Sequence, residues 1–152
     1  MVLDIIDFRI LKELQIDGRI NNNTLANRIG LSPSTCLRRV KHLEALGVIS
    51  RYAAIISPEK VGLSITVYAR IWLKSQDAMT INNFAAAVKT LPEIVECHLM
   101  AGDCDSLLRI IAADLDAYRK FLIKHLTEIE GIQSIKTEIP MQQIKQTSAL
   151  PL

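Results

Sequence analysis

The sequence has few cysteines and no long apolar run, and each scarcity excludes a class of protein. Its 152 residues include only Cys36, Cys97 and Cys104, with no Cys-x-x-Cys pair, so neither a disulfide framework nor a structural zinc site is expected. The apolar runs fall far short of the roughly 20 residues that span a bilayer. The opening MVLDIIDFRI carries acids where a secretory signal has bases. We therefore expect a cytoplasmic protein that does not associate with membranes.

Motifs for catalysis are also missing. The chain contains no GxSxG, no glycine-rich phosphate loop and no HExxH. Cys97, His98 and Cys104 lie near two aspartates, but Cys97 and His98 are neighbours in an expected strand and point to opposite faces. Zinc sites also use tighter ligand spacing. We expect no catalytic site, no metal site and no cofactor.

The net charge of +2 is distributed unevenly along the chain. Residues 1–60 hold nine Lys/Arg against six Asp/Glu, whereas residues 61–152 hold nine against ten. A modestly basic first part is compatible with a polyanionic partner.

Residues 1–56 predict three helices. Apolar residues recur at helical spacing from Asp4 to Ile16, and Asn21–Asn23 offer N-caps for a second helix that Gly30 ends. The third runs from the N-cap Ser32 to Gly47, with a proline in its first turn. The tight turn between the last two helices is typical of a helix-turn-helix.

The third helix is apolar on one side and basic on the other. At about 100° per residue, Cys36, Val40 and Leu43 share a face. The opposite side carries hydroxyls and cations. The second helix of a helix-turn-helix enters the DNA major groove, so we expect base contacts from Ser34, Thr35 and Arg38. The predicted DNA-binding residues are Arg28, Ser32, Ser34, Thr35, Arg38, Arg39, Lys41, His42 and Arg51. The alternative is that these cations only solvate a surface helix.

The segments VIS and YAAIIS after this helix predict two short strands around Arg51, which form a wing. Residues 57–63, with Pro58 and Gly62, are the expected linker.

Residues 64–152 predict a second domain of the α+β class. Apolar residues alternate from Ser64 to Leu73, and further strands are expected at Ile94–Ala101, Ser106–Ala112 and Ile132–Ile139, with helices from Ala78 to Leu91 and after Asp114. This order is the βαββαβ, ferredoxin-like arrangement. Its two helices cover one sheet face, so the face with Tyr68 and Trp72 needs a partner subunit. We expect a homo-oligomer, with the apolar tail packed across the partner.

Several stretches together resemble the Lrp/AsnC (leucine-responsive, or feast/famine) family of transcription regulators. They are LDIIDFRILKELQIDGRI, LSPSTCLRRVKHLEALGVI, RYAAIISPEKVGL, VECHLMAGDCDSLLRI and QQIKQTSALPL. The resemblance implies double-stranded DNA as partner, homodimers that assemble into octamers, and an amino acid bound between dimers. The chain departs from the family at Thr35, where proline is usual, and at Ser106, where an aromatic residue is frequent.

The GDCD loop has the chemistry to bind a free amino acid. Gly102 permits a turn whose N–H groups hold a carboxylate, and Asp103 or Asp105 receives the ammonium. Apolar neighbours favour leucine or methionine. The predicted effector residues are Leu99, Met100, Ala101, Gly102, Asp103, Cys104, Asp105, Ser106 and Ile135. The alternative is a hairpin turn without a ligand.

These features predict a sequence-specific transcription regulator that senses an amino acid at an interface between dimers. Two other classes stay open: an amino-acid-binding regulatory subunit of a metabolic enzyme, and an architectural protein that coats DNA without an effector.

Overall fold

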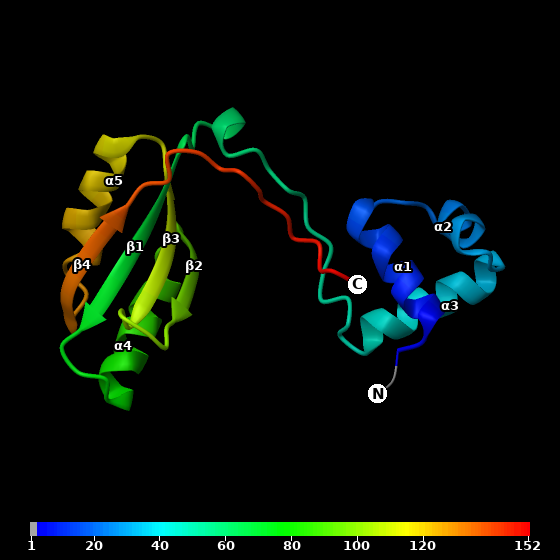
Figure 1. Cartoon of the computed structure of the whole chain (residues 1–152), viewed down its shortest axis with the longest axis horizontal. Coiled ribbons are helices and arrows are strands. Elements are labelled where there is room, and N and C mark those ends of the chain that lie inside the picture. Colours follow the sequence, from blue (N-terminus) through cyan, green and yellow to red (C-terminus); the bar gives the residue numbers. More distant parts are fainter. Residues whose placement is uncertain (1–2) are drawn as a thin grey trace. The chain divides into compact units, whose positions relative to one another are not determined.

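The computed structural model describes residues 3–152, which form two compact units. The first unit contains the chain up to Ile55 together with Lys145–Leu152, and the second contains Ile56–Ile144 (Figure 1). Within the described residues no helix combines the length and the apolar character needed to cross a membrane.

Three helices make up most of the first unit. They are α1 (Ile5–Ile16), α2 (Asn22–Ile29) and α3 (Pro33–Ala45). The side chains of Asp4, Asn21 and Ser32 each cap the helix that follows by accepting backbone N–H groups. Gly30 and Gly47, after α2 and α3, have φ of 76° and 71°, a conformation that glycine adopts without strain. The predicted helix positions are confirmed.

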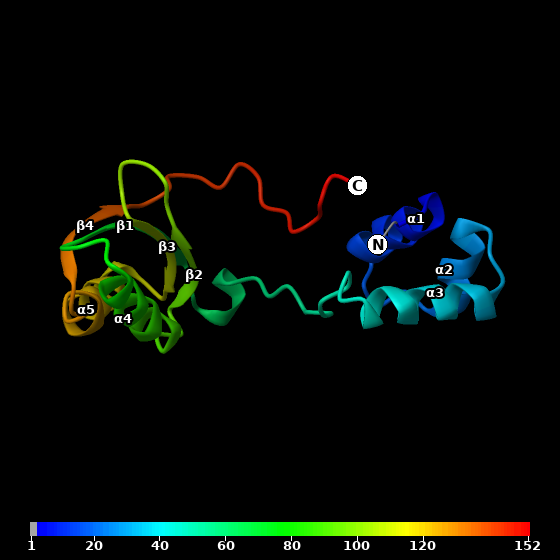
Figure 2. The ribbon, with the colours of Figure 1, turned by 90° about the horizontal axis from the view of Figure 1, so that it is seen from below.

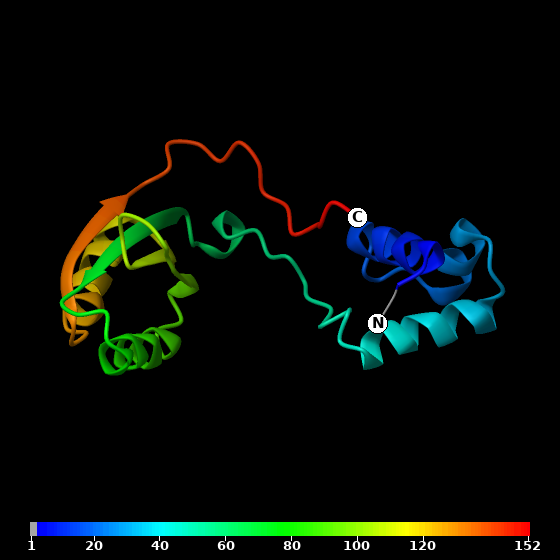
Figure 3. The same ribbon diagram turned by 60° about the horizontal axis from the view of Figure 1, so that its bottom comes forward.

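The apolar stripes of the three helices meet in one small core. Its buried members are Ile10, Leu11, Leu25, Ala26, Ile29, Cys36 and Leu43. Cys36 and Leu43 are the fully buried residues of α3, with Val40 partly buried beside them, as the angular pattern predicts. Burial raises the pKa of the Cys36 thiol. Helix α3 therefore keeps its other side exposed along the edge of the unit (Figure 3).

The predicted strands of the wing are not formed. Residues 48–57 contain no strand, and the side chains of Ile55 and Ile56 are 85% and 60% exposed. A ribbon of two short strands is marginal in water without a third strand or a helix to cover it. This segment is irregular backbone on which Arg51 lies exposed.

The end of the chain lies with the first unit. The side-chain amide of Gln15 on α1 donates to the Leu150 carbonyl at 3.2 Å, and its oxygen accepts from the Leu150 N–H at 2.5 Å. The predicted boundaries placed residues 64–152 in one domain, whereas the structure groups Lys145–Leu152 with α1–α3.

The second unit is a four-stranded antiparallel sheet with two helices. Its elements are η1 (Glu59–Val61), β1 (Ile65–Leu73), α4 (Ala78–Lys89), β2 (Ile94–Leu99), β3 (Ser106–Ala112), α5 (Leu115–Phe121), η2 (Leu122–Leu126) and β4 (Ile132–Glu138). The strand order is β2-β3-β1-β4, and α4 and α5 lie on the same side of the sheet (Figure 2). This is the predicted βαββαβ arrangement, with one addition: α5 continues into the π-helical turn η2.

The two faces of this sheet differ in chemistry. Toward the helices, Val67, Ala69 and Ile71 of β1 are fully buried and pack in a core with Phe84 and Tyr118. The other face carries the half-buried apolar side chains of Tyr68, Trp72, Leu107 and Ile111. Arg70 and Arg109 lie between them and form ion pairs. No helix of the second unit covers this face (Figure 2).

Candidate DNA-binding surface and effector loop

The hydroxyl groups at the start of α3 bond to one another. Ser32 Oγ accepts from the Thr35 N–H at 3.3 Å and donates to Thr35 Oγ1 at 2.8 Å, and Ser34 Oγ lies 3.3 Å from Ser32 Oγ. The Asn22 side chain donates to the Pro33 carbonyl at 2.8 Å, which fixes the turn between α2 and α3. Ser32 is thus engaged as a helix cap, while Ser34 is exposed.

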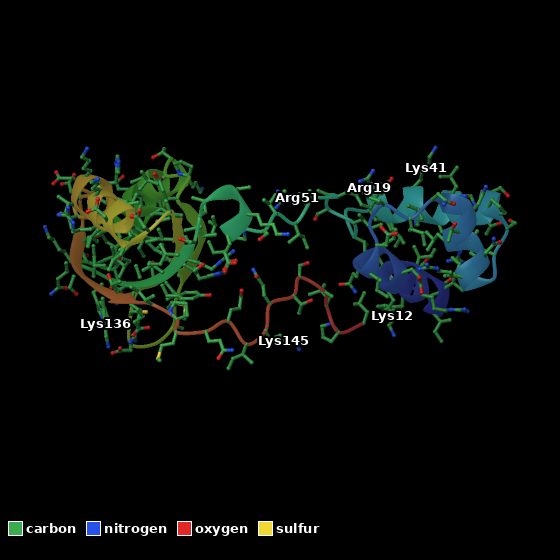
Figure 4. All side chains as sticks on the ribbon, turned by 90° about the horizontal axis from the view of Figure 1, so that it is seen from above. Lys12, Arg19, Lys41, Arg51, Lys136 and Lys145 are labelled. Carbon is green, nitrogen blue, oxygen red and sulfur yellow. The ribbon has the colours of Figure 1, made fainter. Side chains whose placement is uncertain are left out.

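Three of the predicted DNA-binding residues of α3 are exposed basic side chains. Arg38, Lys41 and His42 lie on the outer side, and Figure 4 shows Lys41 projecting away from the helix. In the part of the chain that the structure describes, Arg38 and Lys41 have no ion pair. They are free to meet phosphates or base edges.

Two of the predicted DNA-binding arginines instead have acidic partners within the unit. Arg28 Nη1 lies 2.8 Å from Glu13 Oε2. Arg39 Nη1 lies 2.8 Å from both Asp4 Oδ2 and Asp7 Oδ1. Sequence reasoning missed these pairs because they depend on how α1 packs against the other two helices. The DNA-binding roles of both arginines stay predictions.

Tyr52, which sequence reasoning did not single out, ties the irregular segment to α3. Its Oη donates to Glu44 Oε1 at 2.9 Å, and its ring lies near Gly18. Burial and this hydrogen bond to a carboxylate raise the pKa of Tyr52 to about 12. Arg51 directly precedes this anchor, which limits how far it moves from the end of α3.

In the predicted effector loop, Met100–Ser106, the two candidate aspartates make different contacts. Asp105 Oδ2 accepts from the Leu73 N–H and Oδ1 accepts from the Gln76 side chain, both at 2.7 Å. The Asp105 N–H donates to the Ile71 carbonyl, and its own carbonyl accepts from the Met100 N–H. Asp105 is therefore the anchor that holds the loop on the end of β1, and both its carboxylate oxygens are occupied.

Asp103 is the exposed carboxylate of the same loop, with 75% of its side chain accessible. It pairs with Arg70 Nη2 at 2.5 Å, and its carbonyl accepts from Trp72 Nε1 at 2.7 Å. The Arg70 guanidinium lies 5.3 Å from the centre of the Trp72 ring. Arg70 and Trp72 were missed as site residues, although the alternation of β1 already placed both on the open face.

A hollow of about 250 Å³ adjoins this group along the edge strand β4. It is lined by Trp72, Gln133, Ser134, Ile135 and Lys136. Trp72 connects the hollow with the loop. Its side chain lines the hollow, and its Nε1 donates to the Asp103 carbonyl in the loop. The hollow is shallow and largely open to solvent.

The structure does not bring all predicted pocket residues together. Leu99 pairs with Ser106, Ser106 with Ile71, and Ile71 with Ile135, so the four form one row across the sheet. Leu99 and Ile135 therefore lie on opposite edge strands, about 14 Å apart at the usual strand spacing. The strand order separates the two side chains within one chain, and their place in an effector pocket between dimers stays a prediction.

Two further members of the predicted site are buried. Cys104 and Ser106 are almost inaccessible, and the Ser106 Oγ has no hydrogen-bond partner in the described structure. Ala101 and Gly102 are exposed, as is Met100 at 43%. Cys97 pairs with Leu108 and His98 with Leu107, so the two point to opposite faces, as predicted. Residues 3–152 contain no group of three His, Cys, Asp or Glu side chains arranged for a metal ion.

Comparison with known families identifies the two units. Residues 3–50 match the winged helix-turn-helix DNA-binding model, and residues 66–150 match the Lrp/AsnC ligand-binding domain. The chain belongs to the Lrp/AsnC family. It is thus a DNA-binding transcription regulator with an amino-acid-binding domain, and the predicted resemblance and α+β fold class are confirmed.

Curated Lrp/AsnC relatives match over nearly the whole chain. The leucine-responsive regulatory protein of Salmonella typhimurium is 43% identical over 148 residues, which cover 97% of this chain and 90% of the relative. That of Haemophilus influenzae is 43% identical over 150 residues, or 99% of this chain and 90% of the relative.

Solved Lrp/AsnC structures share the fold. A transcriptional regulator from Neisseria meningitidis in complex with L-methionine has a TM-score of 0.95 at 37% identity, covering 99% of this chain and 97% of that one. An AsnC family regulator from Agrobacterium tumefaciens has a TM-score of 0.93 at 37% identity, covering 98% and 97%.

Proposed function

We propose that this regulator senses a small apolar amino acid, methionine or leucine, through the loop Met100–Ser106 and the adjoining hollow. The observation that supports the proposal is that the two loop aspartates differ in their contacts and exposure. Asp105 is occupied in holding the loop, whereas Asp103 is exposed beside a cation and an aromatic ring.

The charges around Asp103 complement a free amino acid. The Asp103 carboxylate accepts the ammonium, and the Arg70 guanidinium, which now holds Asp103, donates to the effector carboxylate. Binding exchanges one exposed ion pair for two charge-assisted contacts. The apolar walls of the hollow, Trp72 and Ile135, then take the side chain.

The choice of methionine or leucine has support from two sources. The hollow has no carboxylate among its lining residues, and its single charged one is Lys136, so an uncharged side chain fits better than a basic one. The Neisseria meningitidis neighbour is a complex with L-methionine, and the curated relatives are named for leucine. The unbranched side chain of methionine and the γ-branched side chain of leucine agree with the lining of the hollow and with these relatives.

Calorimetric titration of the full chain with the twenty amino acids tests this proposal. We expect binding of L-methionine or L-leucine, and no binding of D-methionine, whose ammonium and carboxylate are exchanged relative to Asp103 and Arg70. Equal affinity for both enantiomers, or no binding by any of the twenty, contradicts the proposed site.

The open sheet face supports a homodimer that assembles further. Tyr68, Trp72, Leu107 and Ile111 are half-buried apolar side chains on one surface, and a second copy of the chain offers the same surface for self-complementary packing. We propose dimers that form octamers, with the effector shifting their arrangement and hence the spacing of the α3 helices on DNA. Light scattering with and without L-methionine measures this; a monomer at micromolar concentration contradicts it.

Sequence-specific DNA binding by α3 is the output of this mechanism. The match of residues 3–50 to a DNA-binding model speaks against a metabolic regulatory subunit that never meets DNA. An architectural protein without effector predicts DNA binding that no amino acid changes. A gel-shift titration with the effector present and absent separates these functions.

A further inference from the structure

Arg39 lies between two carboxylates at the start of α1, those of Asp4 and Asp7, which together are called the socket. The Asp4 carboxylate accepts the N–H groups of Ile6 and Asp7 at 2.9 Å, and the Asp7 side chain accepts the Asp4 N–H at 3.2 Å, so the two aspartates form a reciprocal capping box. The backbone of α1 therefore fixes both carboxylates. A single Arg39 nitrogen, Nη1, lies 2.8 Å from each of them.

We infer that Arg39 is a positioning residue for DNA recognition: it binds α3 to the start of α1 and offsets part of the negative charge of Asp4 and Asp7, and it does not contact DNA itself. This inference rests on α3 being the recognition helix.

Burial distinguishes this pair from an ordinary surface contact. Only 13% of the Asp7 side chain and 28% of the Arg39 side chain are accessible. The hydrogen bonds to Asp7 and Asp4 raise the pKa of Arg39, which stays charged, and the Asp7 N–H together with Arg39 lowers the pKa of Asp4. A partly buried carboxylate pair without its cation loses this stabilisation.

The neighbour Arg38 has the opposite surroundings. One residue earlier on the helix, about 100° around its axis, Arg38 is exposed and has no ion pair in the described part of the chain. The two adjacent arginines therefore have different roles. Arg38 is available to the duplex, and Arg39 is committed to the fold.

The charge of the socket also matters for DNA affinity. Asp4 and Asp7 lie beside a helix that has to approach phosphates, within the roughly 10 Å over which charges act at 0.1 M salt. With Arg39 in place, its positive charge offsets one of the two negative charges. Without it, two bare carboxylates repel the duplex, so loss of Arg39 weakens binding although no DNA contact is removed.

The salt dependence of DNA binding tests the absence of a direct contact. The full-length chain is titrated by fluorescence anisotropy against a duplex selected from a random pool by the parent protein, at several salt concentrations. Each lost phosphate contact lowers the slope of log affinity against log salt by about 0.9. Lys41→Ala, the control, is expected to show that decrease. Arg39→Ala is expected to weaken binding about three- to thirtyfold, in part through a repulsion that salt screens. The double variant Arg39→Ala/Asp7→Asn keeps the parental net charge, so its slope is expected to equal that of the parent. A slope of this double variant lowered as in Lys41→Ala overturns the inference.

A double-mutant cycle tests the link to α1. Asp7→Asn is expected to restore affinity at least about threefold in the Arg39→Ala background and to have little effect in the parent. The reason is that the Asp7 carboxylate lacks a cation only where Arg39 has been replaced. Arg39→Lys, which keeps one cation for both aspartates, is expected to retain parental affinity. An equal effect of Asp7→Asn in both backgrounds overturns the inference. If circular dichroism shows loss of helix in Arg39→Ala, the same cycle is measured with Arg39→Gln, which keeps the long stem.

Discussion

Replacing either loop aspartate should abolish the response to the effector, but only one replacement should destabilise the fold. Asp105→Ala removes the acceptor of the Leu73 N–H and of the Gln76 side chain. A hydrogen bond to a charged group contributes about 1.5–3 kcal/mol, and the exposed Gln76 regains water, so we expect a loss of about 2–3 kcal/mol in the free energy of unfolding. Asp103→Ala removes an exposed ion pair worth about 0.2–1 kcal/mol.

The chain contains a built-in probe for this experiment. Trp72 is its single tryptophan, and its Nε1 donates to the Asp103 carbonyl, so fluorescence during urea unfolding reports on the second unit and on the loop itself. Each variant is measured without ligand and with L-methionine at 100 times the parental dissociation constant. The parent should gain about 2.7 kcal/mol from ligand, and both variants should gain nothing.

The matched control is Asp105→Asn, which keeps an oxygen for the Leu73 N–H while the Gln76 amide reverses to present its own oxygen. It should lose less stability than Asp105→Ala. Parental stability in Asp105→Ala, or a loss in Asp103→Ala as large as in Asp105→Ala, refutes the assignment of anchor and ligand contact.

Three further outcomes follow from individual side chains. Arg38→Ala should weaken binding to the preferred duplex by about 1–3 kcal/mol and relax the preference at one base pair, whereas an equal loss on all sequences identifies a phosphate contact. Ser106→Ala should raise the free energy of unfolding by about 1 kcal/mol in urea titrations, since it removes a buried hydroxyl without a partner; a loss shows that the hydroxyl is bonded. In the folded state Tyr52 holds its proton up to about pH 12, above the usual value of 10 for tyrosine, so stability is lost as pH rises through this interval. Tyr52→Phe should lack that part of the loss in pH-dependent unfolding, and an unchanged profile contradicts the raised pKa of Tyr52.

The parts of the fold that sequence reasoning predicted well are those that local chemistry specifies. Asp4, Asn21 and Ser32 begin helices because their side chains satisfy N–H groups a few residues away, and Gly30 ends one because it adopts positive φ. The bounds of β3 were predicted to the residue for the same reason: alternation and a flanking turn are properties of a short window.

The features that sequence reasoning missed depend on distant partners. Whether Val48–Ser57 forms a ribbon depends on a surface to cover it, which the pattern of those residues does not contain. Leu99 and Ile135 are both apolar, but the strand order places them on opposite edge strands. Likewise, the pairing of Arg39 with α1 follows from helix packing, whereas its charge and position on α3 indicate only that it is near the basic face.

The two hydrogen bonds between Gln15 and Leu150 link two segments of the helical unit that are far apart in the sequence. In sequence, the ligand-binding unit Ile56–Ile144 lies between the two segments that make up the DNA-binding unit. A purification tag fused after Leu152 would therefore load the helical unit and not the sensing one. Excising residues 1–55 to study DNA binding in isolation would likewise remove those helices from the last segment they touch.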